Sequence, residues 1–121
     1  MKKDFISHRA EKDRALEHAI DIGMEAVAQE GEANAIREVT RLVYDTKPSP
    51  RYIRTGDLRK SLSHKYVKSE KAAYIGTNLE YAPYVEYGNQ YVNERPYLRN
   101  AGRKYRDQYN QIIKDALREL S

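Results

Sequence analysis

The stretch RAEKDRALEHAIDIGMEAVAQEGEANAIREVTRLVY, residues 9–44, decides the fold that the sequence predicts. Apolar and small residues recur in it at intervals of three or four, which places them on one face of a helix. They are Leu16, Ile20, Gly23, Val27, Gly31, Ala35, Val39 and Leu42. This face is rich in alanine and glycine, so another backbone can approach it closely. Gly31 costs about 1 kcal/mol relative to alanine, which makes it the point of a possible kink, and the helix is expected to continue through it.

Residues 45–57, DTKPSPRYIRTGD, are predicted to form an exposed basic loop after this helix. Pro48 and Pro50 cannot continue a helix, and each restricts the backbone of the residue before it. Basic residues gather in the loop and just after it, at Lys47, Arg51, Arg54, Arg59 and Lys60. Asp57 suits the N-cap of a single helical turn that leads into a strand.

Two short strands, Leu62–Val67 and Ala72–Ile75, are predicted from their β-branched and aromatic residues. The polar residues 68–71 between them indicate the connection of a hairpin. Residues 90–93 are a candidate third strand. Because helices flank these strands, the predicted fold is α+β, with a small antiparallel sheet packed against a long N-terminal helix and a C-terminal helix.

Further helices are indicated by proline and glycine. Pro83 suits the first position of a short helix, and Gly88 suits the residue just past its end. Pro96 is expected to open the last helical region, and Gly102 to separate a first short turn from the C-terminal helix. That helix shows a second amphipathic stripe. The stripe consists of Tyr105, Tyr109, Ile112, Ile113, Ala116, Leu117 and Leu120.

Composition bounds the class of protein. The 121 residues fit a single domain, residues 1–121. The net charge of +4, from 22 basic and 18 acidic residues, permits contact with nucleic acid but does not require it. The absence of cysteine excludes disulfides and thiol chemistry and fits a reducing cytoplasm. No apolar run is long enough to span a bilayer, and residues 1–11 are too polar for a signal peptide.

No catalytic, cofactor-binding or metal-binding constellation is recognisable in the sequence. His8, His18 and His64 have no metal-ligand spacing, and His64 is expected to be a partly buried structural residue. Ser61 and Ser63 lack the G-x-S-x-G context of a hydrolase. The glycines form neither a phosphate-binding loop nor a dinucleotide fingerprint. We therefore expect a protein that is not an enzyme, with no cofactor and no metal.

The chain has 11 tyrosines, one phenylalanine and no tryptophan. A tyrosine ring is large and apolar while its hydroxyl can stay in water, so tyrosine suits both a core and an interface. In the segment Tyr81–Gly88, Tyr84 and Tyr87 are three residues apart and are expected to share a face. This segment is predicted to be a rigid turn, and two roles stay open for it: packing within the chain and contact with another subunit.

Three stretches carry a resemblance to a known family. They are TGDLRKSL at residues 55–62, IGTNLEYAPYVEYG at residues 75–88 and RPYLRNA at residues 95–101. In this order, after a long N-terminal helix, they resemble the Hong Kong 97 gene-product-ten-like family of phage tail-component and head–tail joining proteins. The chain departs from the family pattern at Asn89 and Asn100, where members often have threonine and proline.

The resemblance implies a structural virion-assembly protein of a tailed phage or prophage, of the siphovirus type. Such proteins form rings at the neck, where head joins tail, or at the tail end. The implied partners are copies of the chain itself in a hexamer, formed in some cases only on a template, together with neighbouring neck or adaptor proteins and the tail tube protein. DNA would pass through the lumen without sequence-specific binding, and no membrane is involved. The implied location is the virion, after synthesis in the cytoplasm of the bacterial host.

The residues of the family motifs are the candidates for subunit contacts. They are Thr55, Gly56, Leu58, Arg59, Ser61, Gly76, Thr77, Tyr81, Ala82, Pro83, Tyr84, Glu86, Tyr87, Gly88, Arg95, Pro96 and Leu98. In the loop, Arg51, Tyr52 and Arg54 are candidates for a surface that faces the lumen and DNA, with Tyr52 able to stack on a base. A solvated linker is the other interpretation of this loop. The alternative function is that of a small basic nucleic-acid-binding protein.

Overall fold

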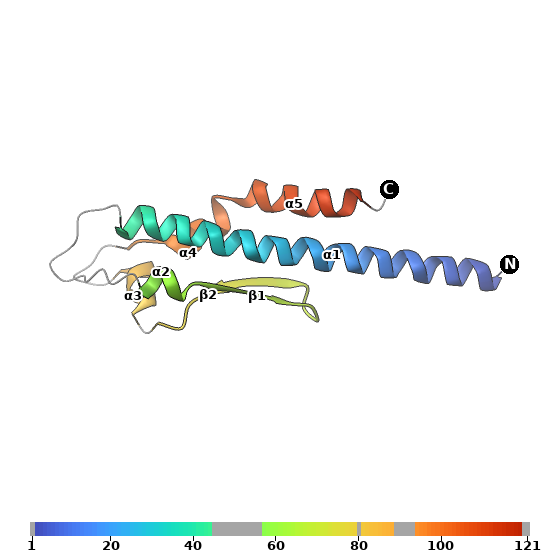
Figure 1. The fold of residues 1–121 in the computed structure, drawn as a ribbon, viewed down its shortest axis with the longest axis horizontal. Helices are drawn as coiled ribbons and strands as arrows, with labels where there is room; N and C mark the ends of the chain where they lie inside the picture. The colour runs from blue at the N-terminus through green and yellow to red at the C-terminus, as the bar shows by residue number, and fades with distance from the viewer. Residues whose placement is uncertain (1, 45–56, 80, 89–93, 120–121) are drawn as a thin grey trace.

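A computed structural model of the chain describes residues 2–44, 57–79, 81–88 and 94–119. Its elements are α1 (Lys2–Val39), a π-helical turn (Thr40–Tyr44), α2 (Asp57–Ser61), β1 (Ser63–Val67), β2 (Ala72–Gly76), α3 (Ala82–Tyr87), α4 (Tyr97–Arg103) and α5 (Arg106–Arg118). The predicted α+β fold is confirmed (Figure 1). Of the predicted loop only Asp57 is described, and the candidate strand at 90–93 lies outside the described residues.

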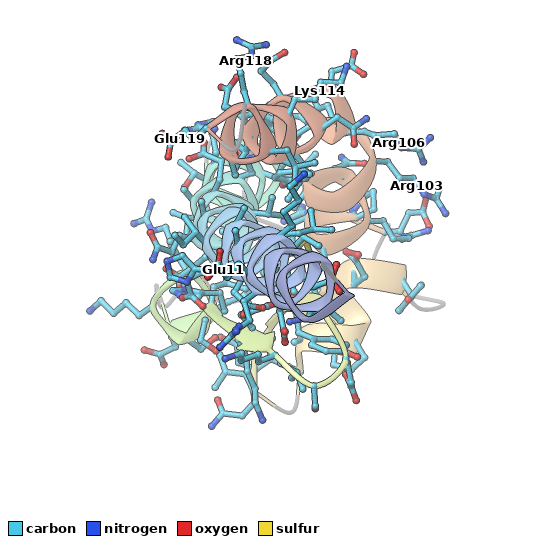
Figure 2. The ribbon with its side chains drawn as sticks, turned by 90° about the vertical axis from the view of Figure 1, so that its right-hand side faces the viewer. Glu11, Arg103, Arg106, Lys114, Arg118 and Glu119 are labelled. Carbon is cyan, nitrogen blue, oxygen red and sulfur yellow. The ribbon has the colours of Figure 1, made fainter. Side chains whose placement is uncertain are left out.

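The long helix α1 lies between the other elements. The hairpin of β1 and β2 packs on one side of it, and α5 packs on the opposite side (Figures 1 and 2). The short helices α2, α3 and α4 gather near the C-terminal end of α1, while its N-terminal end extends past both α5 and the hairpin (Figure 1). The sheet and the C-terminal helix therefore share α1 as their common support.

The small residues of α1 let two neighbours approach it from different directions. Successive members of the stripe from Gly23 to Val39 are four residues apart, and each such step turns about 40° beyond a full helical turn. The stripe therefore winds around α1. A Cβ atom at Gly23 would lie 3.1 Å from Cβ of Ala116 in α5, and one at Gly31 would lie 2.8 Å from Cδ1 of Ile75 in β2. The helix is continuous through Gly31, as expected.

The hairpin agrees closely with its prediction. β1 and β2 pair antiparallel, with Ser63 opposite Gly76 and Val67 opposite Ala72. In the turn between them, the Glu70 backbone N–H donates to the Val67 carbonyl at 3.1 Å, and Lys71 takes a left-handed backbone conformation with φ of 53°. A two-stranded sheet alone is at best marginally stable in water, so its packing on α1 is what holds it in place.

The core lies at the C-terminal end of α1, where α2, α3 and α4 meet it. Its buried residues are Ala35, Val39, Leu58, Leu62, Ala82, Val85, Tyr97 and Ala101. Partly buried around them are Ile36, Leu42, Ile75, Leu79, Tyr81 and Leu98. Tyr97 is the largest side chain that is fully buried among the described residues. Each of the three motif stretches contributes to this one core, so the motifs are joined in space although they are separated in sequence.

The predicted helix ends are mostly confirmed. α2 begins at Asp57, and Gly88 ends α3 with a left-handed φ of 72°. α3 begins at Ala82, one residue before Pro83. The expected break at Gly102 is wrong: α4 continues through Gly102 to Arg103, and the break falls at Lys104 and Tyr105. The surroundings of Gly102 are open, because no described atom of a neighbouring element lies within 4 Å of the place where a Cβ would stand.

Candidate assembly surface

Ion pairs fix the hairpin to the middle of α1. The Lys71 ammonium group donates to Oδ1 of Asp21 at 2.7 Å and to Oε1 of Glu17 at 3.2 Å, and the Tyr66 hydroxyl also donates to Asp21. The hydrogen bonds from Lys71 and then Tyr66 hold the pKa of Asp21 below its ordinary value. The tip of the hairpin is therefore anchored near Asp21, and it leaves the part of α1 before Glu17 without support from the sheet.

A buried amide fixes α5 to the opposite side of α1. Asn34 is fully buried, and its Nδ2 donates to Oε1 of Gln108 at 2.8 Å and to the Tyr109 hydroxyl at 3.0 Å. Its Oδ1 accepts a hydrogen bond from Arg37, and the Tyr109 hydroxyl donates to the carbonyl of Ala101. Burial raises the pKa of Tyr109, so this hydroxyl stays protonated and able to donate. The network joins α1, α4 and α5.

A third face of α1 is covered by neither neighbour. Ile22 lies at its centre with 54% of its surface exposed. On one side of Ile22 an open groove of about 380 Å³ runs along the contact between α1 and α5. Its lining residues are Ala15, His18, Ala19, Ile22, Gly23, Ala26, Ile112, Asp115, Ala116 and Glu119. On its other side, a second groove towards β1 shares His18, Ile22 and Ala26 with the first and ends at Tyr66 and Lys68. Below, "the α1–α5 groove" refers to the first of these.

The C-terminal part of α1 carries a cluster of basic residues around a buried carboxylate. Glu38 is 1% exposed, and its Oε2 lies 2.7 Å from Nη2 of Arg41 while its Oε1 lies 3.0 Å from Nζ of Lys104. Arg37 lies over the ring of Tyr105, 6.0 Å from its centroid. A shared cleft is lined by three basic side chains, Arg37, Arg41 and Lys104, which we call the basic cluster. Their three positive charges exceed the single negative charge of Glu38.

Glu38 is expected to make stability depend on acid pH. Burial raises the pKa of Glu38, but the hydrogen bonds from Lys104 and Arg41 outweigh it and hold the pKa below the ordinary value of 4.5. The ion pairs of Glu38 with Arg41 and Lys104 therefore contribute their full stabilisation above pH 4.5. This stabilisation is lost as the pH falls through the lowered pKa of Glu38 in the folded state. Urea unfolding at neutral pH and at pH values below 4.5 measures this loss.

The matched variants for this pH test are Glu38→Gln and Glu94→Gln. Glu38→Gln should be less stable than wild type at neutral pH and should lose less stability on acidification, because the titrating group is gone. Glu94 is 58% exposed, so Glu94→Gln should follow the wild-type curve. A Glu38→Gln curve parallel to that of wild type at all pH values would contradict the assignment.

The motif residues divide into buried and exposed groups. Leu58 and Ala82 are buried in the core, and Tyr81 and Leu98 pack against it. The Ser61 hydroxyl donates to the carbonyl of Leu58 at 2.7 Å and hydrogen-bonds Thr77, next to Gly76 at the end of β2. Arg59, Pro83 and Tyr87 are exposed, and Tyr87 is 65% exposed beneath the guanidinium group of Arg99. The Arg95 backbone N–H donates to the carbonyl of Val85 at 2.8 Å, just before Pro96 opens α4.

Other candidates have no described side chain. Arg51, Tyr52, Arg54, Thr55 and Gly56 lie outside the described residues, and of Tyr84 only the backbone is described. His64 is partly buried, as expected, with Nε2 3.4 Å from Glu25 and Nδ1 3.5 Å from Glu32. In the described part of the chain, no cluster of three or more His, Cys, Asp or Glu residues is placed to hold a metal ion. None of the described helices is long and apolar enough to cross a membrane.

Comparison with known proteins identifies the family. Residues 7–88 match the family described as "Bacteriophage HK97-gp10, putative tail-component". This chain belongs to the HK97-gp10-like family. No curated protein sequence and no solved structure matches it. The resemblance seen in the sequence is thereby confirmed, and membership supports a structural role in a phage particle.

The HK97-gp10-like match begins at Ser7, inside α1, and ends at Gly88, just after α3. The stretch RPYLRNA lies beyond it, yet Tyr97 and Ala101 from this stretch are buried in the same core as Leu58 and Val85 from the matched part. The uncovered face of α1 also lies inside the matched region. Sequence reasoning missed this face, although Ala15, Ile22, Ala26 and Ala33 recur on α1 at helical spacing and could have indicated it.

Proposed function

We propose that this member of the HK97-gp10-like family is a structural subunit of a tailed phage or prophage that forms a ring at the head–tail junction or tail end. Family membership carries the proposal. It is supported by the shape of α1, which is packed on two sides and leaves an apolar third face open around Ile22. A subunit in a ring needs two different complementary surfaces, because its contacts are heterologous and close by rotation.

The basic cluster suggests where DNA passes. In the sequence, Arg41 comes shortly before the segment that contains Arg51, Tyr52 and Arg54, and Arg59 comes shortly after it. Arg59 donates to Thr40 at 3.3 Å, so the two flanks of the segment lie close together. In the proposed ring the basic side chains of the segment and its flanks line the lumen and contact phosphates without reading the sequence. Tyr87, exposed on the surface of α3, is a candidate for contact with a neighbouring protein of the neck or tail tube.

The test is made on phage particles. Particles assembled without this protein should accumulate as separate heads and tails, and addition of the purified chain to the mixture should restore joined, infectious particles. Electron microscopy would show its density as a ring, with six copies expected by family resemblance. Infectious, joined particles that lack the protein altogether would contradict the proposal.

A second function, binding of nucleic acid by the free subunit, is favoured by the basic cluster alone. Titration of the dilute chain with duplex DNA at increasing salt separates the two. Tight binding that weakens steeply with salt would support this second function, because each phosphate contact releases counterions. The ring proposal instead expects weak binding by the monomer, since six subunits together would supply the charge around DNA.

A further inference from the structure

We propose that neighbouring copies join when the N-terminal end of α1 from one copy lies in the α1–α5 groove of the next. The N-terminal arm is defined here as residues 2–14 of α1. This inference rests on the proposed self-assembly and names the surfaces that carry it. Three observations support this contact. The arm projects from the fold, the groove has an apolar lining, and the arm and the groove carry opposite charges.

The arm projects beyond the rest of the described fold. None of the other described elements lies beside it (Figure 1), and residues 11–14 are all exposed. At a rise of 1.5 Å per residue, the arm is about 20 Å long. Most helical stability in proteins comes from packing of one face against something else, rather than from the helix itself. A helix end of this length therefore gains most of its stability when another surface covers it.

The groove has the form that receives a helix. α1 contributes Ala15, Ala19 and Ala26 to its lining, and α5 contributes Ile112 and Ala116. Small side chains such as Ala15, which is exposed, and Ala26, which is half-buried, let a further helix come close to this edge of the α1–α5 contact. Ile22 stands exposed at the edge and would be covered by an incoming helix. Burial of its side chain stabilises such a contact by the hydrophobic effect.

Charge complementarity suits the arm as the occupant of the groove. Residues 2–14, KKDFISHRAEKDR, contain five basic and three acidic residues, so they carry a net positive charge. Besides His18, the titratable side chains that line the groove, within the described part of the chain, are the carboxylates Asp115 and Glu119. Glu119 lies on the side of α5 away from Arg103 and Arg106 (Figure 2). Opposite charges at a contact raise the rate of association and fix its orientation.

The arrangement also satisfies the demand for two different surfaces. Each copy offers its arm to one neighbour and its groove to another, which makes the contact heterologous. The groove begins at Ala15, directly after the arm, so the arm points away from the groove of its own copy and leaves it free for the next. Such contacts propagate from copy to copy and close into a ring where the rotation allows.

Cross-linking tests the contact directly, because the chain has no cysteine of its own. A mixture of the single-cysteine variants Lys12→Cys in the arm and Glu119→Cys at the groove should form disulfide-linked pairs in assembled particles and in concentrated protein. The control mixture is Lys12→Cys with Lys65→Cys, since Lys65 is an exposed residue of the hairpin outside the groove. We expect the first mixture to give several-fold more cross-linked pairs than the control.

The variant Ile22→Glu provides a second, independent test of the contact. Because Ile22 is 54% exposed, the variant should keep the wild-type circular dichroism spectrum and urea midpoint while the Lys12–Glu119 cross-link is lost. The same change at exposed Tyr74, Tyr74→Glu, should leave the cross-link intact. Cross-linking at the control level in particles that nevertheless join heads to tails would overturn the arm–groove contact and leave the proposed function standing. Joined particles without any of the protein would overturn the proposed function itself.

Discussion

Replacement of Tyr97 by alanine is expected to lower the free energy of unfolding by about 3–5 kcal/mol, the usual cost of removing a buried aromatic ring. Tyr97 is 0% exposed and is the largest side chain in the core. Five of the other seven buried members of that core are alanine or valine, which are too small to fill the space that a lost ring would leave. Native domains are stable by only about 5–15 kcal/mol, so this loss would threaten folding.

Urea unfolding of Tyr97→Ala beside Tyr74→Ala provides the measurement. Both variants remove a tyrosine ring, but Tyr74 is 51% exposed on β2, where its hydroxyl donates to Glu70 at 2.7 Å. The exposed substitution should cost less than about 1 kcal/mol. Similar midpoints for the two variants would mean that the core is not organised around Tyr97. If Tyr97→Ala does not fold at all, its urea curve shows no cooperative transition, and this result also agrees with the expected loss of stability.

The sequence predicts the parts of this fold whose signals are local. Residues of α1 repeat at helical spacing, and the β-branched and aromatic residues of the hairpin flank a polar turn, so each could be recognised without knowledge of its neighbours. Pro96 and Gly88 mark helix ends for equally local reasons. The prediction of a break at Gly102 was wrong because a glycine interrupts a helix only where the context also favours a break. Here the break between α4 and α5 falls at Lys104 and Tyr105.

The buried polar residues could not be predicted in the same way. Asn34 and Glu38 lie within a helix full of polar side chains, and nothing in the sequence separates them from their exposed neighbours. Each is buried only because a residue far along the chain reaches it: Gln108 and Tyr109 bond to Asn34, and Lys104 pairs with Glu38. Pairings across 66 to 75 residues depend on how α5 folds back on α1.

The candidate assembly surface shows the same limit. The motif residues direct attention to residues 55–101, and in the structure many of them serve the core, as Leu58 and Ala82 do. The uncovered face around Ile22 becomes visible only when α5 and the hairpin are both in place, because an exposed face of a helix is defined by what packs on its other sides. Local patterns therefore predict the elements and miss the surface that they leave open.

Loss of the Glu86 carboxylate is the second change for which we expect a large effect. Glu86, in α3, is 3% exposed and accepts backbone hydrogen bonds from Arg99 at 2.8 Å and Leu98 at 3.3 Å, in the first turn of α4. Pro96 stands at the N-cap of that helix without a side-chain hydrogen bond, so the carboxylate of α3 takes the capping role. Arg99 in turn donates from Nη2 to the Glu86 carbonyl at 2.7 Å.

Glu86→Ala should therefore destabilise the protein by about 2–4 kcal/mol, since it leaves the part-buried N–H groups of Leu98 and Arg99 without their acceptor and removes the carboxylate that lies 3.5 Å from Nε of Arg99. Glu86→Gln keeps one acceptor oxygen and should cost less. The matched control is Glu94→Ala, because Glu94 pairs with the same Arg99 at 3.2 Å but is 58% exposed, and exposed pairs contribute about 0–1 kcal/mol. If Glu86→Ala and Glu94→Ala lose the same free energy of unfolding in urea, the Glu86 carboxylate stabilises the protein by pairing with Arg99 and not by capping the start of α4. A loss confined to Glu86 would instead tie the stretches at residues 75–88 and 95–101 together through one side chain, which explains physically why both occur in the same chain.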